Sequence, residues 1–169
     1  TSIFVKPKRV IRSYPEMRVV YYKYTGDYKK GWLQFEPFVD KINEKYGIDL
    51  KWKPSFGIYY DSPLIIPVDE RRCIIGLILP EEVEVPACEE ENIHIGKIES
   101  LDGAIAYDAP FRSFCGMLIQ IVRIYDKLMN DEEMKTYPME LYAYNKPYEF
   151  SVVSGTKEAT HGLMAAYPE

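Results

Sequence analysis

The residue whose setting most clearly suggests chemistry is a glutamate that lies between tyrosines. Glu140 belongs to the segment Met139–Tyr144 (MELYAY), whose residue types predict a β-strand. Because side chains alternate along a strand, Glu140, Tyr142 and Tyr144 should share one face. A carboxylate among aromatic rings is partly removed from water, which raises its pKa and makes it a better general base. The alternative is a surface glutamate that pairs with a lysine such as Lys146.

Tyrosine is unusually frequent in this sequence. The chain has 15 tyrosines, and aromatic residues make up 14% of its 169 residues. A tyrosine has an apolar face and a polar edge, so an excess suits a partly hydrated ligand cleft, although edge strands also tolerate it. The hydrophobic content of 47% indicates a single globular domain over residues 1–169. The formal net charge of −5 argues against direct binding to nucleic acid.

Other residues that commonly do chemistry form no convincing pattern. The only histidines, His94 and His161, are isolated, and the three cysteines have neither the even count of a disulfide framework nor the spacing of a zinc site. The acidic stretch Glu81–Glu91 lacks the alternating oxygen ligands of a calcium loop. We therefore expect no metal and no cofactor. The chain has no apolar run of the ~20 residues that a membrane-spanning helix needs, so we expect no membrane contact by this chain itself.

The two halves of the chain show the same order of expected elements, β-α-β-β. The first half predicts strands and one helix at Met17–Thr25, Trp32–Tyr46 (helix), Phe56–Asp61 and Cys73–Leu79. An acidic linker, 81–92, follows. The second half predicts strands at His94–Ser100 and Gly103–Tyr107, a break at Ala109-Pro110, and later strands at Met139–Tyr144 and Phe150–Ser154. The helix between them carries an apolar stripe of Phe114, Leu118, Ile121, Tyr125 and Leu128.

A constant shift of 83 residues superposes the halves, for example Tyr24 on Tyr107, which predicts pseudo-repeats at about 14–80 and 93–156. We expect an α+β fold: a tandem β-α-β-β duplication with one antiparallel sheet, both helices on one face and a concave ligand cleft on the other. The shift also places Gly57 opposite Glu140, leaving room for a flat ligand. The expected walls are Tyr24, Tyr28, Tyr59, Tyr107, Phe111 and Tyr142. Trp32 is either a further wall or a core residue.

Several short motifs resemble those of GyrI-like domains, which are also called effector-binding domains. The segment 24–28 (YTGDY) is similar to the family's H-x-G-P-Y turn, and 107–111 (YDAPF) is its second copy. The segment 137–142 (YPMELY) resembles the family's P-x-E-x-Y strand. The stretch 59–63 (YYDSP), with Pro67, Arg72-Cys73 and Gly76 downstream, resembles the branch found in animal ER-phagy receptors. Both turns carry tyrosine where the family has histidine.

The resemblance implies that Glu140 faces a ligand cleft, where the family's transcription activators bind planar cationic drugs. One branch of the family hydrolyses cyclopropanoid DNA-alkylating compounds by adding water, a detoxification. In that reading Glu140 is the general base, and Tyr142 donates to the oxygen where charge develops. The alternative is a non-catalytic ligand- or partner-binding domain, as in the ER-phagy receptors. We expect a planar aromatic small molecule as the partner, and a cytoplasmic location or, behind an N-terminal anchor, the cytosolic face of the ER.

Overall fold

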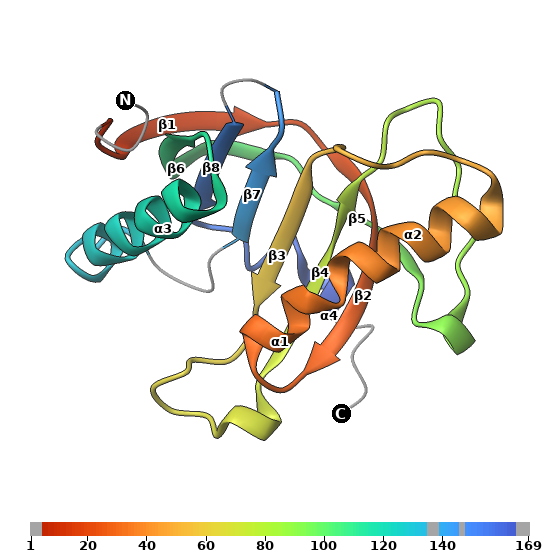
Figure 1. The fold of residues 1–169 in the computed structure, drawn as a ribbon. Helices are drawn as coiled ribbons and strands as arrows, with labels where there is room; N and C mark the ends of the chain where they lie inside the picture. The colour runs from red at the N-terminus through yellow and green to blue at the C-terminus, as the bar shows by residue number, and fades with distance from the viewer. Residues whose placement is uncertain (1–4, 135–138, 146–147, 165–169) are drawn as a thin grey trace.

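A computed structural model describes residues 5–134, 139–145 and 148–164 of the chain (Figure 1). The expected motif residues Tyr137 and Pro138, and the expected partner Lys146, lie outside the described residues. The strands are β1 (Lys8–Tyr14), β2 (Met17–Thr25), β3 (Ser55–Tyr59), β4 (Arg72–Ile78), β5 (His94–Ile98), β6 (Leu101–Phe111), β7 (Met139–Ala143) and β8 (Tyr148–Val153). The α-helices are α1 (Tyr28–Leu33), α2 (Phe35–Tyr46), α3 (Phe114–Met129) and α4 (His161–Met164).

The eight strands form one antiparallel sheet in the order β1-β6-β8-β7-β3-β4-β2-β5. The order is symmetric with respect to the two halves of the chain. If β1 is exchanged with β5, β2 with β6, β3 with β7 and β4 with β8, the same order results, read from the other edge of the sheet. The halves meet at the central pair β3–β7, where Gly57 lies directly opposite Glu140. The α+β class and the antiparallel sheet are confirmed, and an ancestral duplication stays a prediction.

Both long helical segments cover the same face of the sheet, as predicted. Directly opposite residues of an antiparallel sheet share a face, and one such row runs across the sheet as Tyr22, Ile75, Gly57, Glu140, Val152 and Tyr107. At one end of this row the Tyr22 ring packs against Phe38 of α2. At the other end Val152 and Tyr107 belong to the apolar cluster that contains Ile124 of α3. Figure 1 shows α1–α2 and α3 on this face.

The opposite face of the sheet is filled with apolar side chains, so the expected cleft on that face is wrong. One buried cluster on this side draws residues from strands β2 to β8, including Tyr21, Phe56, Ile74 and Met139. The short helix α4 adds Leu163, whose Cδ2 atom lies where a Cβ on Gly96 would stand. The sheet therefore curls around its own core, and open space is left on the helix face instead.

Two element boundaries differ from the sequence-based expectation. The first helical segment is divided at Gln34 into α1 and α2, and α1 begins earlier because Asp27 caps it by accepting a hydrogen bond from the Lys29 backbone N–H. Strand β6 continues through Pro110 to Phe111. The pairing of β1 with β6 reaches only as far as Asp108, so the proline lies where one side of the strand has no neighbour and its missing N–H leaves no gap.

Candidate functional site

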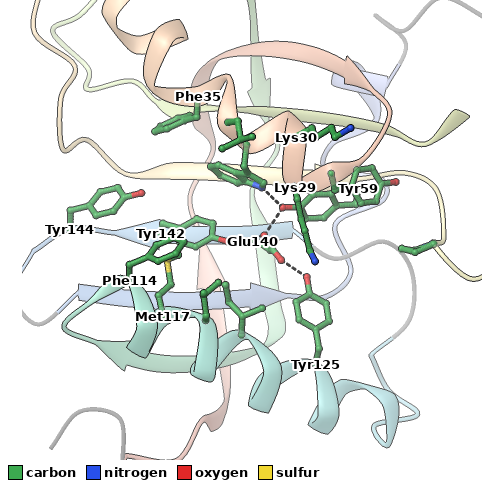
Figure 2. A pocket seen from close by; sticks show the side chains of 16 residues that line it. Lys29, Lys30, Phe35, Tyr59, Phe114, Met117, Tyr125, Glu140, Tyr142 and Tyr144 are labelled. Carbon is green, nitrogen blue, oxygen red and sulfur yellow. Dashed lines mark hydrogen bonds between the residues drawn. The ribbon is translucent and has the colours of Figure 1, made fainter. Parts of the chain in front are cut away.

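A cavity of about 860 Å³ lies on the helix face, between the α1–α2 segment and α3, above the central strands β3 and β7 (Figure 2). The strands directly beneath the helices are covered, whereas β3 and β7 lie between them and remain open. The cavity is lined by Tyr28, Lys29, Lys30, Trp32, Leu33, Phe35, Tyr59, Pro63, Phe114, Met117, Leu118, Ile121, Tyr125, Glu140, Tyr142 and Tyr144. Aromatic and aliphatic side chains dominate, and Glu140 is the one acid among these residues.

Glu140 lies at the floor of the cavity and accepts hydrogen bonds from three tyrosines. The hydroxyl groups of Tyr59 and Tyr142 donate to Oε1 at 2.5 and 2.9 Å, and the hydroxyl of Tyr125 donates to Oε2. These donors come from β3, β7 and α3, so the carboxylate joins the two halves of the sheet to one helix (Figure 2). Glu140 as a residue is 5% exposed, and no described residue forms an ion pair with its carboxylate.

A fourth aromatic residue extends this network. The indole Nε1–H of Trp32 donates to the Tyr59 hydroxyl at 2.6 Å, which in turn donates to Glu140. The Trp32 ring lies over Gly57: a Cβ on that glycine would stand 2.9 Å from both the indole Cζ2 and the Tyr59 oxygen. The space above Gly57 is thus occupied by these two side chains, and the expectation that it stays free for a ligand is wrong.

Burial controls the proton affinities in this network. It raises the pKa of Glu140 above the usual range of a glutamate, while the hydrogen bonds from Tyr125, Tyr59 and Tyr142 act in the opposite direction. The pKa values of the same tyrosines are raised well above that of a free tyrosine, first by burial and then by the charge of Glu140. The phenols therefore keep their protons and remain donors, and the only group poised to exchange a proton is the carboxylate.

Five of the eight residues that the sequence indicated lie together at the cavity: Tyr28, Trp32, Tyr59, Glu140 and Tyr142. Tyr28 also has a fixed position, because its hydroxyl donates to the backbone carbonyl of Asp61 at 2.7 Å and its ring contacts that of Tyr59. Trp32 is both a wall of the cavity and a core residue, since it lines the cavity and packs against apolar clusters from both halves.

The other three indicated residues, Tyr24, Tyr107 and Phe111, do not line the cavity. The Tyr24 ring packs under α1 against Gly31. Tyr107 donates its hydroxyl to Asp131, and the Phe111 ring contacts that of Tyr148. The reason lies in the strands: these residues belong to β2 and β6, which are the strands that the helices cover.

Sequence reasoning missed Tyr125 as a partner of Glu140, although it identified the stripe on which Tyr125 lies. That stripe faces the cavity, where Phe114 is 70% exposed and Leu118 is 46% exposed. The helix instead buries Gly116, Gln120 and Ile124 against the sheet. The sequence feature that could have identified Tyr125 is its position within an apolar stripe, because a tyrosine hydroxyl in such a place needs a polar partner. Tyr144 lies two residues beyond Tyr142 and also lines the cavity, as strand alternation predicted.

No family model matches the sequence, and no curated protein matches it. Among solved structures, the chain is similar to EcmrR in a complex with DNA, with 13% identity and a TM-score of 0.61, over 88% of this chain and 56% of EcmrR. It is similar to the EcmrR C-terminal domain, with 10% identity and a TM-score of 0.55, over 89% of this chain and 97% of that domain. SAV2435 bound to tetraphenylphosphonium is similar with 9% identity and a TM-score of 0.50, over 91% and 98%.

The chain thus spans about half the length of EcmrR and corresponds to its C-terminal domain. At these identities the likeness shows the fold alone, and this is the GyrI-like fold that the sequence motifs indicated. No helix among the described residues is both long and apolar enough to cross a bilayer.

Proposed function

We propose that this GyrI-like domain binds a bulky aromatic organic cation in the cavity, with Glu140 as the anionic partner of the cation. One observation carries this proposal: Glu140 is a buried carboxylate at the floor of an aromatic cavity, and no described cationic side chain pairs with it. A buried charge without an opposite charge is costly, and the three phenol donors offset only part of that cost.

A cationic ligand would supply the missing charge. The faces of Trp32, Tyr28 and Tyr142 at the cavity can attract a cation through their ring electrons, each for about 0.5–2 kcal/mol when water is excluded. Apolar groups of the same ligand would cover the aliphatic residues of α3. The similar protein SAV2435 is bound to tetraphenylphosphonium, a compound in which aryl rings surround a positive charge.

The test compares tetraphenylphosphonium with tetraphenylborate, which has the same shape and the opposite charge, by calorimetric titration. We expect the phosphonium to bind more tightly than the borate. Glu140→Gln keeps the size of the side chain and removes its charge, so it should weaken phosphonium binding by about tenfold or more. Borate binding should not weaken in this variant, because the substitution removes a repulsion. Equal affinities of the two ions for the parent protein would contradict the proposal.

Water addition to a cyclopropanoid electrophile is a second candidate function. It is favoured by a lone pair of the Glu140 carboxylate that accepts no hydrogen bond from the described residues. Among the described residues Oε2 accepts only the Tyr125 hydroxyl, so one lone pair can take a proton, and burial has made the carboxylate a stronger base. Glu140 would remove a proton from water as the water oxygen bonds to the ring carbon. The strained C–C bond breaks, and its electron pair moves to a conjugated carbonyl oxygen that accepts a hydrogen bond from the Tyr142 hydroxyl. The proton that Glu140 took from water then passes to this oxygen, so that the carboxylate is restored.

Incubation with a cyclopropane-bearing alkylator tests this second candidate, because the product must gain the mass of one water. Glu140→Gln should then lower turnover by about 10²–10⁴-fold while an uncharged substrate still binds. Full turnover in that variant would remove Glu140 from the base role. A parent protein that binds the compound and leaves its mass unchanged would reduce the site to a binding function.

A further inference from the structure

Two lysines, Lys29 and Lys30, lie at the cavity in addition to Glu140. They occupy the first turn of α1, and both side chains are exposed. Figure 2 shows the Lys29 side chain extending over the cavity, with its amino group in the region between Tyr59 and Tyr125. Positive charge is therefore present at the mouth of the cavity, and negative charge is present at its floor.

The exposed lysines of the described structure differ in their ion pairs. Lys45 pairs with Glu91, and Lys97 pairs with Glu16 and Glu99, whereas others, such as Lys8 and Lys157, have no carboxylate partner among the described residues. No described acid pairs with Lys29 or Lys30, and the only acid in the cavity lining is buried at its floor.

This arrangement favours a cation that also carries an acidic group over a cation without one. With Glu140 ionised, the charged residues of the lining sum to +1, from Lys29, Lys30 and Glu140. A ligand with only positive charge is attracted by the floor and repelled by the mouth. A ligand that also carries an acidic group is attracted by both, because its acid reaches the lysines when its cationic part lies at the carboxylate.

We propose, building on the proposed function, that the ligand is zwitterionic: an aromatic cation that also bears a carboxylate or a similar acidic group. Its cationic ring system binds above Glu140, and its acidic group binds at Lys29 and Lys30. The aromatic side chains between the two charged ends hold the apolar body of the ligand. The two lysines therefore select ligands that carry an acidic group, while Glu140 binds the cationic part of the ligand.

Rhodamine B and its ethyl ester form a matched pair of probes for this proposal. Both have the same planar cationic ring system, and only rhodamine B has a free carboxylate at neutral pH. Fluorescence polarisation measures the dissociation constant of each dye. We expect rhodamine B to bind the parent protein about two- to tenfold more tightly than the ester, since exposed ion pairs are individually weak. This ratio should fall as salt is added, because salt screens exposed charges.

The double variant Lys29→Met/Lys30→Met keeps the length of both side chains and removes their charges. It should bring the ratio of the two dissociation constants to about one, mainly by weakening rhodamine B. Lys8→Met/Lys157→Met is the matched control, because both of these lysines are exposed and neither lines the cavity. It makes the same change in net charge and should keep the parent ratio.

The outcomes separate this inference from the proposed function. If both dyes bind the parent protein equally, or if the control variant changes the ratio as much as the cavity variant does, the zwitterion proposal is overturned and cation binding stands. If neither dye nor tetraphenylphosphonium binds, both proposals are overturned.

Discussion

The two halves of the sheet have the same arrangement of strands but contribute different side chains where they meet. At the junction of β3 and β7, the first half supplies Gly57 and the second half supplies Glu140. The first half places Trp32 over its glycine, from a helical segment that is divided at Gln34. The second half has the uninterrupted helix α3, which directs Tyr125 at the carboxylate.

This comparison shows that the strand arrangement common to both halves and the side chains that differ between them have separate roles. The common arrangement of strands and helices leaves the central strands uncovered and so creates the cavity. The difference between glycine and glutamate means that the carboxylate at the floor of the cavity comes from the second half alone. Because a pair of directly opposite residues lies at the centre, two large side chains would compete for the same space, and the glycine allows Trp32 and Tyr59 to approach the carboxylate.

The largest effect on ligand binding is expected when the first half loses its glycine. In Gly57→Ala, the new Cβ would stand 2.9 Å from the Trp32 ring and from the Tyr59 hydroxyl, so both must move. We expect the free energy of unfolding to fall by about 1–3 kcal/mol. Affinity for tetraphenylphosphonium should fall by about tenfold or more, because the hydrogen bond from the Tyr59 hydroxyl to Glu140 is disturbed. Urea denaturation and calorimetry measure the two effects.

Gly162→Ala is the control for this prediction, since a Cβ on Gly162 meets no atom within 4 Å. Its free energy of unfolding should stay within about 0.5 kcal/mol of the parent. If Gly57→Ala behaved like the control, the close approach of Trp32 and Tyr59 would have no energetic importance.

The next effect compares one tyrosine from each half. Tyr59→Phe and Tyr125→Phe each remove one hydrogen bond to Glu140, which costs about 1.5–3 kcal/mol for a charged partner. Tyr59→Phe also leaves the half-buried Trp32 N–H without its acceptor, so it should destabilise the protein by about 1 kcal/mol more. Urea denaturation of both variants measures this difference. A larger loss in Tyr125→Phe would show that the indole contact contributes little.

A smaller effect is expected in the pH dependence of stability, which reports the ionisation of Glu140 in the second half. Burial raises the pKa of Glu140 in the folded protein, so between its unfolded and folded pKa values the native state binds more protons. Stability from the neutral carboxyl is therefore present at low pH and is lost as pH rises through the folded pKa. Affinity for phosphonium should rise over the same window, because the carboxylate becomes charged.

Thermal unfolding from about pH 4 to about pH 8 checks this sign when the parent is compared with Glu140→Gln. The stability of the variant relative to the parent should increase with pH, since the amide does not ionise. A constant difference across that range would mean that Glu140 titrates alike in the folded and unfolded chain.

The smallest effect on binding is expected for Tyr107, which the sequence shift pairs with Tyr24. Tyr107→Phe removes the hydrogen bond to Asp131 and should cost about 1 kcal/mol of stability. Its affinity for phosphonium should stay within about twofold of the parent, because Tyr107 lies under α3 and away from the cavity. A strong loss of affinity, with stability unchanged, would show that the cavity extends beneath the helix.

The sequence by itself determined strands β2 to β8, the two long helical segments and which residues of each share a face. Strand alternation placed Glu140, Tyr142 and Tyr144 together, and the constant shift between the halves placed Gly57 opposite Glu140, as the structure shows. These properties follow from spacing along the chain, because side-chain direction in a strand or helix repeats with a fixed period.

Only the tertiary structure decided which face of the sheet stays open and which aromatic residues reach it. The sheet curls because apolar residues of distant strands gather behind it, which closes the face where the cleft was expected. The helices then cover β2 and β6, so Tyr24 and Tyr107 are packed away while Tyr125 meets Glu140. Periodicity defines two faces for each element, but the choice between them depends on contacts between residues far apart in the sequence.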